Sequence, residues 1–464
     1  MRASSIRRVP PGPRGHWALG NRAAFSDDPL AFLQACARDH GDVVRIAERT
    51  YLVAEPALIG EVLGDDGERH GKCDPDPSQR RAAFPASVMN SVGKDWRQKR
   101  QRLQPAFRSA LVRDYAAQAV AATQPLLQRW AQPGDAMDMR VLMTEVCAQL
   151  GAGFLLGDPS QSPHLSQMLP MVDAIMQQTR SQSRHPWWWP TPGNRRLRRA
   201  RDELDAALDR ILAHCLDTPP SAASVLDLLL AEDPQGRSRW CRDETAAMLM
   251  SALEPMAAGL AWTLLLLAQH PQTAQALADE AGAALDADAL PGADVIERLP
   301  LAKACVKEAM RLYPPAWMTA RIAQRATTLS GFDVPAGTQL VVSQWVVHRD
   351  RRNFSDPDAF VPERWLHGAR IQPLPRYAYF PFGGGPRSCI GSMLAMTQMT
   401  VVIACVLHAF ALRLAPDARP SPFPALVLRP LDVRIALLPR PAGAAGMSQA
   451  WPRPSPSVSD IPHG

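Results

Sequence analysis

Residues 382–391, with the sequence FGGGPRSCIG, are the segment best suited to chemistry. The three consecutive glycines permit positive φ angles and a close approach of the backbone to a large ligand. Cys389 stands at the mouth of a predicted helix, where free N–H groups and the helix dipole favour a thiolate. Arg387 adds a fixed positive charge suited to a carboxylate. The combination suggests a metal-bound thiolate; the alternative is a glycine turn with an inert buried cysteine.

This segment resembles the haem loop of the cytochrome P450 haem-thiolate enzymes, Phe-x-x-Gly-x-Arg-x-Cys-x-Gly. Its five defined positions are filled by Phe382, Gly385, Arg387, Cys389 and Gly391. The resemblance runs from about residue 9 to residue 437. It implies haem b as the cofactor and Cys389 as its metal ligand, and it implies that the other loop residues also bind the haem. It also implies the fold of that family, a triangular single large domain that is mainly α with small β-sheets (α+β).

A second motif lies upstream of the loop. Glu308 and Arg311 are three residues apart on a predicted helix, so they share one face and can pair. The resemblance implies that Arg364, in the segment FVPERW (360–365), joins them in a buried ion network that supports the haem loop. Taken alone, this spacing is more often a surface ion pair worth roughly 0–1 kcal/mol.

The resemblance also places cations near the two propionates of haem. Trp96 and Arg100 match a Trp-x-x-x-Arg helix of the family, and a separation of four residues directs both side chains the same way. Arg321 matches a further position that meets a propionate. His348 is another candidate, although a histidine after a strand is more often an ordinary core or surface residue.

The long apolar helix departs from the family pattern Ala-Gly-x-Glu/Asp-Thr-Thr, because residues 251–256 read SALEPM. Glu254 takes the acid position, and Pro255 replaces the oxygen-activating threonine. Proline has no hydrogen-bonding side chain, and it frees the carbonyl of Ser251, which could hold water. We therefore take Ser251, Glu254 and Pro255 as candidate catalytic residues. Two chemistries stay open: monooxygenation with O2, or an atypical reaction such as peroxide-driven oxidation, rearrangement or coupling.

The substrate is expected to be a largely apolar small molecule, since the segments that contact it in the family are apolar here. The pocket candidates are Phe84, Val88, Met89, Trp187, Ala252, Met256 and Met318, with Leu253 and Ala258 as additional ones. Ordinary core packing is the competing interpretation for each of them. The tryptophans 187–189 could instead contact a membrane surface or a carrier, because tryptophan favours such borders.

Electrons are expected from a separate ferredoxin- or flavodoxin-type donor, because no Gly-x-Gly-x-x-Gly segment for a fused flavin or nicotinamide domain is present. Arg97, Lys99 and Arg102 lie on other faces of the Trp96 helix. Such a basic patch would speed the encounter with an acidic donor. A solvated helix face is the alternative. A haem-binding sensor or electron carrier without turnover is a third functional class, disfavoured by the apolar long helix and the basic patch.

The elements that must position these residues are mainly helical. Amphipathic or apolar patterns predict helices at 29–40, 94–104, 141–156, 197–216, 243–270, 301–312 and 391–410. Strands are predicted at 42–46, at 51–53 and within 326–347, and a loop at 185–193. We expect one haem domain over residues 1–440 and a disordered tail, rich in proline and serine, at 441–464.

The composition excludes several other classes. The 464 residues are 46% hydrophobic and 21% charged, which is typical of a globular chain and not of a disordered one. The net charge of +6 (51 − 45) is spread along the chain without a nucleic-acid-binding motif, so no nucleic-acid partner is expected. Eight scattered cysteines without a CxxC pair indicate a reduced chain without structural zinc. Without an apolar leader, and with an uncharged run only at 256–268, we expect a soluble, cytoplasmic protein without a transmembrane anchor.

Overall fold

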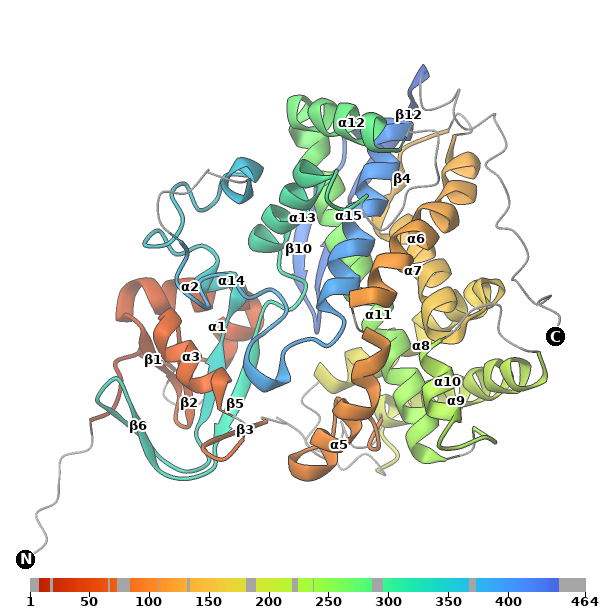
Figure 1. Cartoon of the computed structure of the whole chain (residues 1–464). Coiled ribbons are helices and arrows are strands. Elements are labelled where there is room, and N and C mark those ends of the chain that lie inside the picture. The colour runs from red at the N-terminus through yellow and green to blue at the C-terminus, as the bar shows by residue number, and fades with distance from the viewer. Residues whose placement is uncertain are drawn as a thin grey trace, which may run out of the picture.

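The computed structural model describes residues 8–16, 20–65, 67–72, 84–107, 109–131, 134–180, 189–218, 224–236, 238–285, 295–366 and 373–441. A smaller β-rich region, built from N-terminal strands and strands of the 319–342 segment, lies beside a larger helical body (Figure 1). The expected class, mainly α with small β-sheets, is confirmed. The boundary between a domain at 1–440 and a tail stays a prediction, because residues 442–464 lie outside the described residues.

The helical body contains the elements that carry most of the candidate site. Its helices are α5 (Gly93–Leu103), α6 (Ser109–Trp130), α7 (Met139–Gly151), α8 (Ser162–Arg180), α9 (Pro192–Asp217), α10 (Val225–Leu230), α11 (Arg239–Gln269), α12 (Pro271–Leu285), α13 (Pro300–Leu312) and α15 (Ser392–Ala409). The β-rich region adds α1 (Arg22–Asp27), α2 (Pro29–His40), α3 (Pro56–Gly64) and α14 (Gln344–Val347).

The strands form one main sheet and three smaller ones. The five-stranded sheet has the order β1 (Val43–Ala47), β2 (Thr50–Val53), β8 (Gln339–Val342), β5 (Thr319–Ala323), β3 (His70–Lys72). Only β2 and β8 run parallel in it. The others are β4 (Met137–Asp138), β12 (Arg434–Pro439) and β9 (Phe410–Leu414) in one sheet, the hairpin β6 (Thr327–Leu329) with β7 (Phe332–Val334), and the hairpin β10 (Ser421–Pro424) with β11 (Leu428–Leu431).

The long helix α11 is the centre of the core. It packs against α7, α13 and α15, and it continues through Pro255 without a break. Trp262 is fully buried; its indole donates to the Leu428 carbonyl at 2.9 Å and stacks on the Tyr313 ring at 4.0 Å between centroids. Three described stretches, 139–156, α11 and α15, have the length and composition of membrane-crossing helices, but 78% of the α11 window is buried inside the protein. Such burial is typical of a core helix.

The predicted elements differ from the observed ones mainly at their ends. The 141–156 segment is α-helical to Gly151 and continues as one π-helical turn to Leu156. The 326–347 segment contains three strands but ends in α14, since the Ser343 side chain accepts the Val346 N–H and starts a helical turn. Helix α9 begins at Pro192, inside the expected 185–193 loop, and Thr191 caps it. Residues 185–188 of that loop lie outside the described residues.

Candidate active site

The cysteine loop joins a short 3-10 turn, Gly385–Arg387, to the start of α15. The Cys389 N–H donates to the Phe382 carbonyl at 2.9 Å, which closes the loop. Gly383 and Gly385 have positive φ angles of 72° and 68°, a conformation that a residue with a Cβ rarely adopts. The glycine run therefore has the backbone requirement that the sequence predicted.

Two of these glycines serve packing within the protein. A Cβ added at Gly385 would lie 1.8 Å from the Leu63 carbonyl oxygen in the last turn of α3. A Cβ added at Gly384 would lie 2.2 Å from the Tyr377 ring, whereas Gly383 has no neighbour within 4 Å. Glycine at 384 and 385 thus lets α3 and Tyr377 approach the loop. The sequence suggested a different reason for these glycines, the close approach of a ligand.

The Cys389 side chain is exposed by area, yet it lies in a recess formed by protein atoms. This burial raises the pKa of the Cys389 thiol, while the Gly391 N–H and the Arg100 guanidinium lower it. In the polypeptide alone, the pKa of Cys389 is raised on balance. The sequence suggested that the loop and the helix start favour the thiolate, but these two features do not outweigh burial.

Three arginines from separate elements converge on this recess. Arg387 lies 4.4 Å from the centre of the Trp96 ring and donates to the Ser91 carbonyl at 3.1 Å, and Arg100 lies 5.8 Å from the same ring. Burial, together with the charges of Arg321 and Arg100, lowers the pKa of Arg387 to about 10. The structure thus brings together Trp96 and Arg100 of α5, Arg321 of β5 and Arg387 of the loop.

This cation cluster fits the two propionates of haem. Burial also lowers the pKa of Arg100, and the nearby Cys389 raises it. Within the described part of the chain, neither Arg100 nor Arg387 forms an ion pair with a carboxylate. Half-buried cations without an anionic partner are unfavourable unless an anion joins them. Haem would supply these anions through its two propionates, and its iron would bind the Cys389 thiolate.

His348 has a different place from the expected one. It is fully buried at the end of α14, and its Nε2 accepts the Phe380 N–H at 2.9 Å. Burial, with the charges of Arg311 and Arg349, lowers the pKa of His348 to about 3, so the ring is neutral. The sequence left two roles open for His348, a cation at the ring edge or an ordinary core residue; the structure shows a buried neutral acceptor that holds the backbone just before the cysteine loop.

Glu308 is the centre of a buried ion network. The Arg311 guanidinium donates to its two oxygens at 2.9 and 2.8 Å, and Arg364 Nε donates at 3.0 Å. The Val361 N–H and the Trp365 indole add bonds of 3.0 and 2.8 Å. The Glu308 and Arg311 side chains are both 0% exposed. The three residues predicted as a network thus meet, and Trp365, inside the predicted segment, is a partner that sequence reasoning missed.

Arg311 also organises the chain beyond the network. Its guanidinium donates to the carbonyls of His348, Pro357 and Ala359 at 2.9, 2.5 and 2.9 Å. It lies 5.1 Å from the centre of the Phe354 ring. Since a planar guanidinium has donors in a fixed fork, this one side chain binds three carbonyls, from residue 348 and from the 357–359 segment.

Comparisons with known proteins agree with this geometry. The family model described as Cytochrome P450 matches residues 10–437. The chain belongs to the cytochrome P450 family. It is 30% identical to cyclooctat-9-en-7-ol 5-monooxygenase of Streptomyces melanosporofaciens over 86% of this chain and 88% of the relative. It is 26% identical to pentalenene oxygenase of Streptomyces avermitilis over 89% and 94%. The fold matches the retinoic acid-bound cyanobacterial CYP120A1 with a TM-score of 0.81, at 22% identity, over 94% of this chain and 100% of that one.

The P450 is therefore an oxidoreductase of the monooxygenase class, and the family implies haem with cysteine thiolate ligation. On α11, Glu254 forms an ion pair with Arg429 of β11, and both side chains are 13% exposed. The Ser251 hydroxyl donates to the Ala247 carbonyl at 2.7 Å. Arg429 was missed from the sequence, because nothing in a local pattern links β11 to α11.

The pocket candidates fall into two apolar clusters of the P450. One cluster contains Phe84, Leu253, Met256 and Ala258 as buried members, with Val88 and Ala252 packed against it. Met318 packs against a separate cluster that includes Trp317 and Trp345. Met89 is 43% exposed. Trp187 lies outside the described residues.

The basic patch expected on α5 is largely paired within the P450. Lys99 forms an ion pair with Asp95 at 2.8 Å. Arg102 pairs with Glu232 at 2.9 Å. Arg97 is exposed. Charge on this helix that is already neutralised contributes little to attracting a partner.

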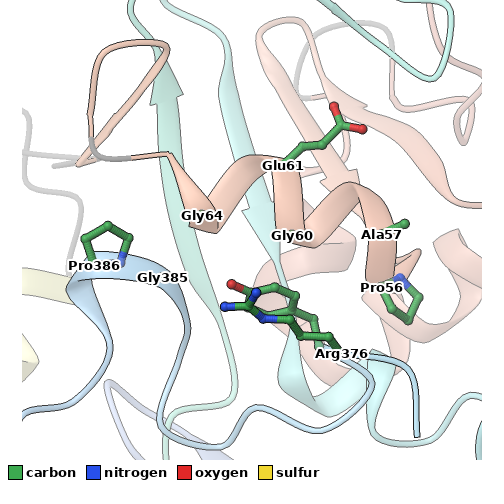
Figure 2. Close-up of a pocket in the computed structure, with 9 residues that line it drawn as sticks. Pro56, Ala57, Gly60, Glu61, Gly64, Arg376, Gly385 and Pro386 are labelled. Carbon is green, nitrogen blue, oxygen red and sulfur yellow. The ribbon is translucent and has the colours of Figure 1, made fainter.

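Two hollows border the cysteine loop. Figure 2 shows the first, of about 620 Å³, between α3 and the loop, with Gly60, Glu61, Arg376 and Pro386 among its lining residues. The second, of about 850 Å³, continues past the loop to α13 and α15, and the exposed Lys303 and Met393 are among its lining residues. Cys389 and the arginines of the recess line neither hollow, so both are depressions outside the candidate active site.

Proposed function

We propose that this P450 inserts one oxygen atom from O2 into a C–H bond of a largely apolar small molecule. The observation that carries the proposal is the recess in which the Cys389 thiol lies near Arg100, which belongs to the same cation cluster as Arg321 and Arg387. The relatives support the apolar substrate, since cyclooctat-9-en-7-ol and pentalenene denote, by their names, an alkenol and an alkene. The apolar cluster that includes Leu253 and Met256 of α11 has matching chemistry.

The protein's contribution to this reaction is binding, orientation and exclusion of water. Haem, when bound, supplies the activation of oxygen. Cys389 would hold its iron, and Arg100, Arg321 and Arg387 would bind its propionates. Apolar side chains of α11 would hold the substrate in a dry environment, in which polar interactions are strengthened. The carboxylate of Glu254 is the ionisable group of the 251–256 segment that can hold a proton.

A second reaction type is favoured by Pro255. This residue replaces the oxygen-activating threonine and offers no side-chain donor. The neighbouring Glu254 is paired with Arg429. Both features are consistent with a P450 that runs an atypical reaction, such as peroxide-driven oxidation, rearrangement or coupling.

We further propose that electrons come from a separate ferredoxin- or flavodoxin-type donor and that the protein is soluble and cytoplasmic. With Lys99 and Arg102 paired, the second hollow, the one next to α13, is the better supported docking place. The exposed cations Lys303 and Arg376 line it together with Ser388 of the cysteine loop and one exposed acid, Glu297. An acidic donor would be attracted to these charges.

The identity of the metal ligand can be tested by spectroscopy. The reduced protein with carbon monoxide should give the red-shifted band of thiolate ligation, and Cys389→Ser should lose it. Cys405→Ser is the matched control, because this cysteine is buried in α15 away from the loop. A band of imidazole type in the wild-type protein would contradict the assignment. Turnover with a ferredoxin system, compared with turnover with peroxide on apolar alkenes and alkenols, then separates the two reaction types.

A further inference from the structure

Two neighbouring carboxylates near the start of α11 bind the backbone of a segment that is distant in sequence. Asp243 Oδ2 accepts the Ala86 N–H at 2.8 Å, and Glu244 Oε2 accepts the Val88 N–H at 2.6 Å. The two carboxylates are buried, at 6% and 0% exposure. Buried acidic side chains are rare unless they are paired, so this pair of contacts calls for an explanation.

The bound segment, residues 84–91, is a compact turn. The N–H groups of Ser87, Asn90 and Ser91 bond within it, to the carbonyls of Phe84 and Ser87, at 3.1–3.2 Å. The N–H groups of Ala86 and Val88, which are partly buried, do not bond within the turn, and backbone donors removed from water need partners. Asp243 and Glu244 supply these two partners from another element.

The far end of the same turn, Ser91, is bound by the cysteine loop and by α5. The Ser91 carbonyl accepts from Arg387 at 3.1 Å, and the Ser91 hydroxyl accepts from Lys99 at 2.9 Å. The turn is thus held between α11, α5 and the cysteine loop. Its Phe84 and Val88 side chains pack in the apolar cluster formed with α11. A shift of the turn would therefore move these side chains relative to the cysteine loop.

We propose that Asp243 and Glu244 are positioning residues for substrate binding, which fix the turn 84–91 as one wall of the substrate site. This inference rests on the proposed function, in which Phe84 and Val88 contact the substrate. Carboxylate oxygens form stronger hydrogen bonds to N–H groups than neutral acceptors do, which suits them to this role. Holding a wall in place before binding lowers the entropic cost of binding.

The surroundings of Glu244 are mixed in charge. Asp243 beside it raises the pKa of Glu244, whereas Lys99 of α5 and the Trp240 indole lower it. Arg239 pairs with Asp243 at 3.3 Å. Burial is the largest effect and raises the pKa of Glu244 to about 7, against the lowering effect of the Val88 N–H. Burial thus disfavours the ionised form of Glu244, and the hydrogen bond from the Val88 N–H favours it.

The test compares Glu244→Ala, Glu244→Gln and Asp243→Ala in the holoenzyme. Hydrogen–deuterium exchange of the 84–91 peptide should become roughly tenfold faster in Glu244→Ala, as for the loss of one charge-assisted hydrogen bond. Glu244→Gln keeps an acceptor oxygen and should be intermediate; it also serves as the readable variant if the alanine variant does not fold. Glu280→Ala is the control, because Glu280 accepts the Leu301 and Ala302 N–H groups at 2.7 and 2.9 Å at the start of α13.

Two azole probes then report on the wall. Phenylimidazole, whose ring must fit beside the turn, should bind several-fold more weakly to Glu244→Ala, whereas imidazole should bind unchanged. In Glu280→Ala both should bind as in the wild type. The inference is overturned if exchange of 84–91 is unchanged in Glu244→Ala, or if both azoles weaken equally. If the wild-type protein lacks the thiolate band with carbon monoxide, the proposed function is overturned instead. The exchange data would then still show whether Glu244 holds the 84–91 turn against α11.

Discussion

Glu254 of α11 and Arg429 of β11 form an ion pair beside the only proline of the long helix. Each side chain is 13% exposed, so both charges are largely removed from water. Leu428, the residue before Arg429, accepts the indole N–H of Trp262 at 2.9 Å, which ties the same hairpin to α11. The carboxylate of Glu254 is therefore paired with a residue of a hairpin that is itself bound to α11.

This arrangement leads to a prediction for Pro255→Thr. The threonine restores both a hydroxyl and a main-chain N–H beside Glu254. If the enzyme works as a monooxygenase, we expect more product per O2 consumed and less peroxide released. Product, O2 and peroxide measured in one assay would check this. If all three are unchanged, Pro255 has no special role in oxygen chemistry.

A matched control separates chemistry from helix stability. Pro125 also lies inside a helix, α6, and is exposed there. Replacing a helix-internal proline can relieve a cost of about 3 kcal/mol in either helix. Pro125→Thr should therefore change thermal stability without changing the ratio of product to peroxide. An equal change of that ratio in both variants would assign the effect to helix stability.

The Glu308 network predicts a large loss of stability on truncation. Glu308→Ala leaves the fully buried Arg311 without its carboxylate, which should cost about 3–5 kcal/mol in the free energy of unfolding. Arg311→Lys should not rescue the protein, because a lysine lacks the fork that binds Glu308 and three carbonyls. Denaturant unfolding and haem retention are the measurements.

A surface pair provides the comparison for this network. Arg38 and Asp39 form an ion pair at 2.8 Å with side chains 73% and 51% exposed. Arg38→Ala should leave the free energy of unfolding nearly unchanged, because solvent screens an exposed pair. A loss of similar size in Glu308→Ala would show that the buried network is not the support inferred for the cysteine loop.

Glu244 predicts a pH dependence of stability with a defined sign. Burial raises its pKa from an ordinary 4.5 to about 7, so between these values the folded protein holds a proton that the unfolded chain has released. Ionisation of Glu244 therefore lowers stability as pH rises through this window. Glu244→Gln removes the titration. The thermal midpoint of the variant, relative to that of the wild type, should rise from pH 5 to pH 8. If the midpoint depends on pH in the same way in both proteins, the raised pKa is contradicted.

Much of this protein follows from its sequence, because the decisive signals are local. The loop 382–391 combines residue types and a spacing that are rare by chance, and the Glu308–Arg311 pair depends only on the geometry of one helix turn. Helix α2 has the predicted ends, since Asp28 caps it and Gly41 follows it. Strand β5 was missed: it alternates little, and its position between β8 and β3 depends on long-range pairing.

The contacts between residues that are far apart in the chain depend on the tertiary structure. The pairing of Glu254 with Arg429, the binding of the 84–91 turn by Asp243 and Glu244, and the neutral His348 all depend on which elements pack together. Gly384 and Gly385 likewise have neighbours that no sequence pattern names. Hydrogen bonds and pKa values depend on the partner and on burial at a few ångströms, and a linear pattern specifies neither of them.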